Sequence, residues 1–221
     1  MDKDICRVKA VIFDMDGVIT NTMPDHYRAW QKVLRLNNIH VTYHDIYSRE
    51  GQPGEEALRE IYQKYKIPYK KEEGMKILSA KEDYFKLNVK QRFISGARTL
   101  LKKLHKNDLK LALVTGTARR EMERILPKSL YDLFSVIVTG NDIKFGKPHP
   151  EPFNKAVEYL GIKKQEAVVI ENAPYGIQSA KAAGLKCFAL ETSLPREYLS
   201  QADAIFDSIK DLNDNIIFDS L

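Results

Sequence analysis

Short apolar runs alternate along the chain with longer segments in which apolar residues recur at helical spacing. The short runs are rich in β-branched and aliphatic residues, as in strands that are buried on both faces. Strands that alternate with helices imply a parallel sheet with helices on both sides. We therefore expect an α/β fold around a parallel sheet. Its predicted strands are Ala10–Asp14, Leu109–Gly116, Ser135–Gly140, Ala167–Asn172 and Lys186–Glu191.

One stretch breaks this alternation. Between residues 23 and 90 the pattern is helical, in segments such as HYRAWQKVLRLNN and GEEALREIYQKY, and contains no convincing strand. We expect this stretch to be a small all-helical domain inserted into the α/β core, which takes residues 1–22 and 91–221. Because the insertion leaves the core just after a predicted strand, its two junctions are placed to act as hinges over the end of the sheet.

Composition excludes several classes of function. The 35 Lys and Arg residues exceed the 30 Asp and Glu residues by five, but they are scattered, without a long basic run or a nucleic-acid reader motif. No stretch has the roughly 18 apolar residues of a membrane span, and the N-terminus lacks the apolar run of a signal peptide. The two cysteines, Cys6 and Cys187, lie far apart in sequence. We expect a cytoplasmic monomer or weak homodimer that binds neither nucleic acid nor membrane.

Polar and charged residues follow the predicted strands where each strand ends, and ligands bind at that edge in open α/β sheets. In VIFDMDGV, Asp14 and Asp16 follow an apolar strand directly. Burying two carboxylates is costly unless a cation or hydrogen-bond donors compensate their charge. Oxygen ligands, donors and one ammonium group together suit a phosphate and a hard cation such as Mg²⁺. The other strand ends and loops contribute Thr115, Gly116, Thr117, Lys147, Glu171 and Asn172.

Residue type suggests a chemical role for each of these groups. Asp14 can present one carboxylate oxygen to Mg²⁺ and the other to phosphorus as a nucleophile. Asp16 can protonate the leaving oxygen and then accept a proton from water. The Thr115 hydroxyl and the backbone amides after it can hold phosphoryl oxygens, while Lys147 neutralises charge that accumulates during transfer. The expected metal site is completed by Glu171 and Asn172.

These motifs resemble those of the haloacid dehalogenase superfamily, in the subgroup with a small helical cap that is similar to β-phosphoglucomutase and phosphoglycolate phosphatase. The resemblance spans nearly the whole chain, through VIFDMDGV, LVTGT with Thr115, the lysine Lys147, and VVIENAPYGIQSAKAAG. It implies a Rossmann-like core, a helical cap domain and a phospho-aspartyl intermediate on Asp14. The Mg²⁺ ligands that it implies are the Asp14 side chain, the Asp16 backbone carbonyl, and the side chains of Glu171 and Asn172.

The sequence departs from that pattern in two places. Relatives often carry two acids in the fourth motif, whereas Asn172 brings an oxygen ligand without a charge. Mutases of the family tend to have an arginine in the cap loop that grips a second phosphate. In REGQPGEEAL, Gly54 stands at that place, although Arg49 is near enough to substitute.

The insertion is also expected to contribute to the site, because a domain that closes over the end of the sheet must contact the leaving group. We expect substrate contacts from the loop residues Glu50, Gly51 and Gln52. His26, early in the insertion, matches a histidine that lies near the substrate in similar proteins. Ordinary packing at a helix N-terminus is the alternative for this residue.

The sequence thus predicts a Mg²⁺-dependent phosphatase, a phosphoric monoester hydrolase that acts on a small phosphorylated metabolite such as a sugar phosphate or a phosphoglycolate-like compound. Three alternatives remain open. A phosphohexomutase similar to β-phosphoglucomutase shares every core residue and differs in keeping water out while the substrate reorients. A dehalogenase needs no metal, and Asp16 together with Glu171 argues against it. A non-catalytic phosphate-binding protein is the third.

Overall fold

A six-stranded parallel sheet forms the centre of the computed structural model, which describes residues 3–221. The strand order is β4-β3-β2-β5-β6-β7, so the chain runs outward from β2 first in one direction and then in the other. A crevice forms where the order reverses in this way, beyond the carboxyl ends of the central strands. The predicted α/β fold class is confirmed. The strands are β2 (Ala10–Phe13), β3 (Lys110–Val114), β4 (Val136–Val138), β5 (Ala167–Glu171), β6 (Lys186–Leu190) and β7 (Ala204–Phe206).

The central strand β2 is buried on both faces of the sheet. Val11 and Phe13 belong to one apolar core, whereas Ala10 and Ile12 belong to the other. Alternate side chains of a strand point to opposite faces, so a continuous apolar run supplies both cores. The first core is covered by α5 (Ala97–Lys106), α6 (Arg119–Ile125), α7 (Lys128–Tyr131) and α10 (Ile209–Asn215). The second is covered by α8 (Glu151–Leu160), α9 (Pro174–Ala182) and the 3₁₀ turn Arg196–Leu199, and a further 3₁₀ turn, Lys164–Glu166, precedes β5.

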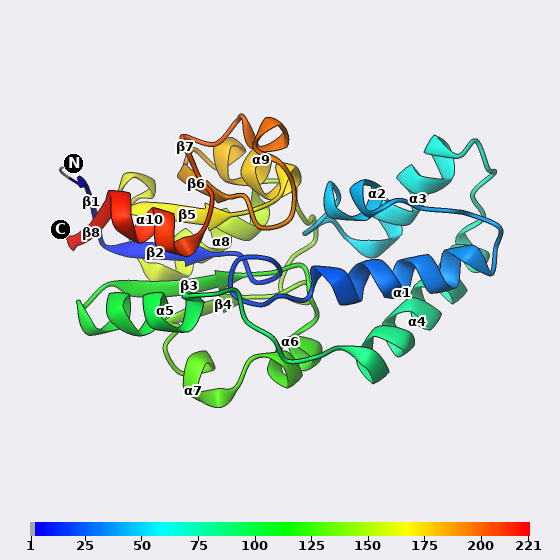
Figure 1. The fold of residues 1–221 in the computed structure, drawn as a ribbon, viewed down its shortest axis with the longest axis horizontal. Coiled ribbons are helices and arrows are strands. Elements are labelled where there is room, and N and C mark those ends of the chain that lie inside the picture. The colour runs from blue at the N-terminus through cyan, green and yellow to red at the C-terminus, as the bar shows by residue number, and fades with distance from the viewer. Residues whose placement is uncertain (1–2) are drawn as a thin grey trace.

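Residues 23–90, here called the helical segment, form helices and no strand. Their apolar faces make a core of their own, in which Trp30 and Leu34 pack with Leu58 and Ile61. Figure 1 shows these helices grouped beyond the end of the sheet toward which the strands point. The helices are α1 (Met23–Arg35), α2 (Tyr43–Tyr47), α3 (Gly54–Lys64) and α4 (Lys71–Asn88).

The two connections between the sheet and the helical segment run side by side. Thr20 and Phe93 form an antiparallel β-bridge. Beside it, the Asn21 amide donates to the Arg92 carbonyl at 2.9 Å, and the Ile94 amide donates to the Ile19 carbonyl at 3.0 Å. The helical segment is therefore attached through a paired backbone, and this pairing holds its base close to the ends of the strands.

Three strands were not predicted from the sequence. β1 (Asp4–Val8) and β8 (Ile216–Ser220) pair in parallel as a separate two-stranded sheet, and β7 has only three residues. Ile5 and Ile217 are 57% and 45% exposed, so these strands lack the buried apolar run that marks the central ones. Both strands lie at the end of the molecule opposite the helical segment (Figure 1). Among residues 3–221, no helix combines the length and the apolar character needed to cross a bilayer.

A buried carboxylate organises the start of α2. Thr42 caps this helix, and the Asp45 side chain accepts hydrogen bonds from the Thr42 amide and hydroxyl, each at 2.8 Å, and from the Tyr65 hydroxyl at 3.0 Å. Lys64 also pairs with Asp45. Burial opposes ionisation, but these donors hold the pKa of Asp45 at about 2, below its ordinary value of 3.8. Asp45 therefore joins α2 to α3 and the residue that follows it.

We expect Asp45→Asn to lower the free energy of unfolding by about 1–3 kcal/mol, because a buried amide cannot accept every bond that the carboxylate accepts. Chemical denaturation measures the change, with Asp83→Asn on the exposed side of α4 as the matched control. The folded-state pKa is depressed, so the stabilisation is complete above about pH 4 and is lost as the pH falls toward 2. An unfolding difference that stays constant from pH 6 to about pH 2.5 would contradict this assignment.

Candidate active site

Side chains from three neighbouring strands and one loop meet at the carboxyl edge of the sheet. Asp14 follows β2, Thr115 follows β3, Glu171 ends β5, and Lys147 lies in the loop between β4 and α8. Because β3, β2 and β5 are adjacent, their ends lie side by side. Asp14, Lys147 and Glu171 are each at most 2% exposed. The structure therefore brings together charged groups that lie far apart in the sequence and buries them.

The Lys147 ammonium group lies between two carboxylates. Its Nζ donates to Asp14 Oδ1 at 2.6 Å, to Glu171 Oε1 at 2.7 Å and to the Val114 carbonyl at 3.3 Å. Burial alone would lower the pKa of Lys147, but the two carboxylates raise it above its ordinary value. Burial raises the pKa of Asp14, an effect that Lys147 offsets in part and that the charge of Glu171 reinforces. Lys147 is thus a fixed cation at the centre of an acidic site.

Asp16 is surrounded by hydrogen-bond donors. The Thr117 hydroxyl lies 3.0 Å from Asp16 Oδ2 and the Thr115 hydroxyl 3.4 Å from the same oxygen, while Thr22 donates to Oδ1. His26 Nε2 is 3.5 Å from Oδ1. Burial alone would raise the pKa of Asp16, but donors led by His26 hold it below its ordinary range. The arrangement therefore favours the ionised carboxylate, which is ready to accept a proton.

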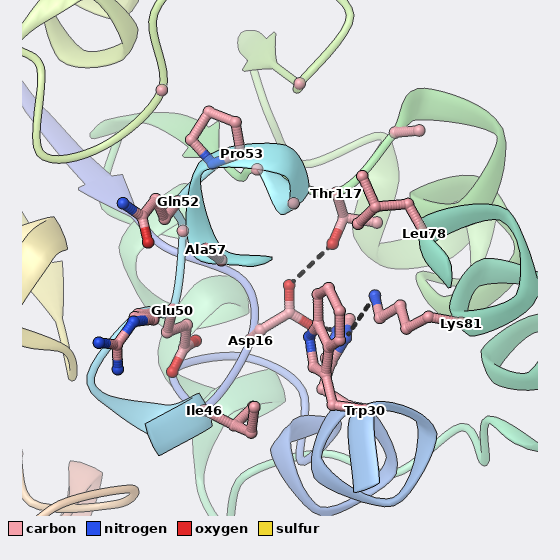
Figure 2. A pocket seen from close by; sticks show the side chains of 18 of the residues that line it. Asp16, Trp30, Ile46, Glu50, Gln52, Pro53, Ala57, Leu78, Lys81 and Thr117 are labelled. Carbon is pink, nitrogen blue, oxygen red and sulfur yellow. Dashed lines mark hydrogen bonds and ion pairs between the residues drawn. The ribbon is translucent and has the colours of Figure 1, made fainter. Parts of the chain in front are cut away.

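His26 connects Asp16 to a lysine of the helical segment. The Lys81 Nζ lies 3.3 Å from His26 Nδ1, and the His26 ring stacks on Phe85 with centroids 4.0 Å apart. Burial and the charge of Lys81 lower the pKa of His26, and burial lowers the pKa of Lys81. Figure 2 shows Lys81 and Trp30 on the same side of the pocket as Asp16.

Sequence reasoning missed Lys81, although a signal for it exists. On α4, Lys81 lies three residues after Leu78 and four before Phe85, and both of those residues are buried. A lysine on the buried face of an amphipathic helix is unusual unless the charge has a partner or a ligand.

The loop before α3 reaches the charged groups of the sheet. Glu50 is buried, and its Oε2 accepts a hydrogen bond from Asn172 Nδ2 at 3.1 Å. Gly51 has φ +76°, and a Cβ there would lie 2.5 Å from Lys147 Cδ, so only glycine fits. The side-chain amide of Gln52 donates a hydrogen bond to Glu60 Oε1 at 2.7 Å. All three loop residues line the pocket, where Figure 2 shows Glu50 and Gln52. Glu50 also contacts Asn172, and Gly51 lies against Lys147.

A cavity of about 360 Å³ lies between the sheet and the helical segment. That volume suits a small organic ligand. Lys147, Glu171, Asn172 and Thr115 are not among the residues that line the cavity. The sequence-predicted residues that line it are Asp14, Asp16, His26, Glu50, Gly51, Gln52, Gly116 and Thr117.

Several buried oxygen atoms of the site have no hydrogen-bond partner among residues 3–221. They include Asp14 Oδ2, Asn172 Oδ1 and Glu50 Oε1. Both carboxylate oxygens of Glu171, by contrast, accept hydrogen bonds. Its Oε1 accepts from Lys147, and its Oε2 accepts from the backbone amides of Asn172 and Ala173.

In the described part of the chain, no three His, Cys, Asp or Glu side chains converge on one point as a metal site does. The free carboxylate and amide oxygens nevertheless fit the donor set of Mg²⁺, which retains waters and needs only one or two protein carboxylates. A ligand role for Asp14, Asp16, Glu171 and Asn172 stays a prediction.

Comparison with known proteins identifies relatives along nearly the whole chain. The sequence model of the haloacid dehalogenase-like hydrolases matches residues 11–190. A phosphorylated carbohydrates phosphatase from Thermotoga maritima is 33% identical over 182 residues, which cover 81% of this chain and 83% of that protein. A validoxylamine A 7'-phosphate phosphatase from Streptomyces hygroscopicus subsp. limoneus is 29% identical over 209 residues, which cover 93% and 95%. A β-phosphoglucomutase structure from Clostridium difficile has a TM-score of 0.79 at 27% identity and covers 91% of each chain.

We expect Lys147→Met to lower the free energy of unfolding by about 3–5 kcal/mol at neutral pH, because it leaves two buried carboxylates without a counter-charge. Their folded-state pKa values would then lie above the unfolded values, so the variant should be least stable at high pH and should recover as the pH falls. Denaturation between about pH 5 and 8 measures this, with the exposed Lys144→Met in the same loop as the control. If Lys147→Met loses the same free energy of unfolding at pH 5 and at pH 8, Lys147 does not compensate the charge of the two carboxylates.

Proposed function

Because the chain belongs to the haloacid dehalogenase-like hydrolases, we propose that it is a Mg²⁺-dependent phosphatase of a small phosphorylated metabolite, in the sugar-phosphate class. The observation that carries this proposal is the state of Asp14. One of its oxygens is held by Lys147 at 2.6 Å, and the other is buried and free. A carboxylate oriented by a fixed cation, with one oxygen unengaged beside a cavity, is suited to attack phosphorus.

In the proposed reaction, Asp14 Oδ2 forms a bond to phosphorus as the bond from phosphorus to the ester oxygen breaks. Asp16 delivers a proton to that leaving oxygen. Water then attacks the phospho-aspartyl group and gives a proton to Asp16, while phosphate leaves and the Asp14 carboxylate is restored. The proton that Asp16 takes from water is the one that it delivers in the next turnover. The donors around Asp16 favour its ionised form, which is the form present between the two half-reactions.

The remaining residues position the phosphate and balance its charge. Gly116 and Thr117 line the cavity, where phosphoryl oxygens would lie. The Thr117 amide donates to the Thr115 hydroxyl and the Thr117 hydroxyl donates to Asp16, so a bound phosphate would take over these donors. Asp14, the Asp16 backbone carbonyl and Asn172 would hold Mg²⁺, with Glu171 keeping Lys147 in place. When bound, Mg²⁺ would lower the repulsion between the phosphate and the carboxylates.

The helical segment, which we propose acts as a cap, supports hydrolysis over phosphoryl transfer between two positions of a sugar. Gly54 offers no charge for a second phosphate. Arg49, the nearest substitute, donates from Nε to Glu60 Oε2 at 3.1 Å and from a terminal nitrogen to the Asp45 carbonyl at 2.8 Å. Its guanidinium group is thus already neutralised within the cap.

We expect Asp14→Asn to abolish release of phosphate from p-nitrophenyl phosphate in the presence of Mg²⁺, because an amide is not a nucleophile. Circular dichroism checks that the variant is folded, and Asp203→Asn, at the exposed edge of the sheet, is the control for a lost acid. Removing the metal with EDTA should abolish wild-type turnover, and added Mg²⁺ should restore it. Substantial activity in Asp14→Asn would exclude the covalent mechanism.

We expect a hexose 1-phosphate incubated with Mg²⁺ and the protein to yield free phosphate and sugar. Phosphorus NMR distinguishes this outcome from formation of the 6-phosphate, which would establish the mutase instead. In the same assay, Gln52→Ala should change the relative rates over a panel of phosphate esters, since Gln52 lies along the cavity wall. An unchanged profile would remove Gln52 from substrate recognition.

A further inference from the structure

Glu50 is a buried carboxylate outside the motifs at the strand ends. It belongs to the loop between α2 and α3 and is 8% exposed. Its Oε2 accepts the hydrogen bond from Asn172, while its Oε1 has no partner among residues 3–221. A carboxylate buried in this way is costly unless a positive charge lies beside it.

The cations near Glu50 are engaged elsewhere. Lys147 lies between Asp14 and Glu171, and Arg49 is paired with Glu60. In the described part of the chain, no salt bridge to Glu50 forms. Burial and the nearby carboxylates of Asp14 and Asp16 raise the pKa of Glu50. A bound cation would supply the positive charge that an ionised Glu50 lacks among the described residues.

Asn172 connects Glu50 to the group of free oxygen atoms. Its Nδ2 donates to Glu50 at 3.1 Å and to the Ser193 hydroxyl at 2.7 Å, which leaves Oδ1 as the unpartnered atom of the amide. An aspartate at position 172 would have no hydrogen to donate and would repel Glu50. The amide is therefore the complement of the loop carboxylate.

We propose that Glu50 is the second acidic group of the divalent-cation site, so that the cap loop supplies the negative charge that Asn172 lacks. The proposal rests on the Mg²⁺ site of the proposed function and deepens it. Glu50 Oε1 joins Asn172 Oδ1 and the Asp14 carboxylate in the oxygen set around the cation. Because Glu50 reaches the sheet only while its loop is packed against Lys147 and Asn172, cation binding and closure of the helical segment are coupled.

The experiment is calorimetric titration of Mg²⁺ into the full chain after removal of metal with EDTA. We expect Glu50→Gln to weaken Mg²⁺ binding about tenfold or more, as loss of a partner at a metal site does. Adding Asn172→Asp to Glu50→Gln should recover most of the Mg²⁺ affinity. In the double variant the carboxylate and the amide have exchanged positions, so the site has the same charge and the two side chains can still form a hydrogen bond. Glu56→Gln, an exposed acid on the same helical segment, is the control and should bind as wild type does.

Hydrogen exchange provides a readout of the coupling. Mg²⁺ should slow exchange of the backbone amides of residues 48–54 in the wild type, and this protection should be absent in Glu50→Gln. Circular dichroism verifies that each variant is folded.

Three outcomes would overturn the inference. Wild-type Mg²⁺ affinity in Glu50→Gln would remove Glu50 from the site, and a raised KM for p-nitrophenyl phosphate with unchanged metal affinity would make it a substrate contact instead. If Glu50→Gln weakens Mg²⁺ binding and the added Asn172→Asp does not restore the affinity, Glu50 does not supply the charge that Asn172 lacks, and the inference is also overturned. If the titrations give the expected pattern but the wild type releases no phosphate from any ester, the proposed function fails and this assignment stands.

Discussion

The buried ammonium group of Lys147 is the interaction on which the site depends. It allows Asp14 and Glu171, at the ends of adjacent strands, to lie in an interior where two carboxylates alone would repel each other. The same bonds tie the loop after β4 to β2 and β5, across the point where the strand order reverses. One lysine thus fixes both the charge and the geometry of the Asp14 carboxylate. With Asp16 and Glu50 added, the site retains an excess of negative charge that suits a divalent cation.

Neither the sheet nor the helical segment encloses the cavity alone. The sheet supplies Asp14 and Asp16, and the helical segment supplies Glu50, together with the pair formed by His26 and Lys81. Further contacts across the cleft run from Tyr175 on α9 to Glu60 on α3, at 3.0 Å. Residues of the helical segment therefore contact the groups that we expect to perform the chemistry.

The sheet and the helical segment contribute different residues to the cavity, and the similar proteins differ in the reactions that their names give. The chain is similar both to phosphatases of different phosphorylated compounds and to a β-phosphoglucomutase, so proteins that resemble it carry out more than one reaction. In this chain Arg49 is paired with Glu60 inside the helical segment, and the amide of Asn172 donates a hydrogen bond to the loop carboxylate of Glu50. Both features concern the helical segment rather than the sheet.

The sequence by itself determined the fold class, the five central strands, the helical character of residues 23–90, and the gathering of Asp14, Asp16, Thr115, Lys147 and Glu171. Local periodicity reports burial, and parallel strands place their carboxyl ends at one edge, so no long-range information was needed. β1 and β8 could not be predicted from the sequence, because half-exposed strands lack a continuous apolar run. Only the tertiary structure decided that Glu50 meets Asn172, 122 residues away, and that Lys81 meets His26. Such contacts depend on how the helical segment packs over the sheet, which no local pattern records.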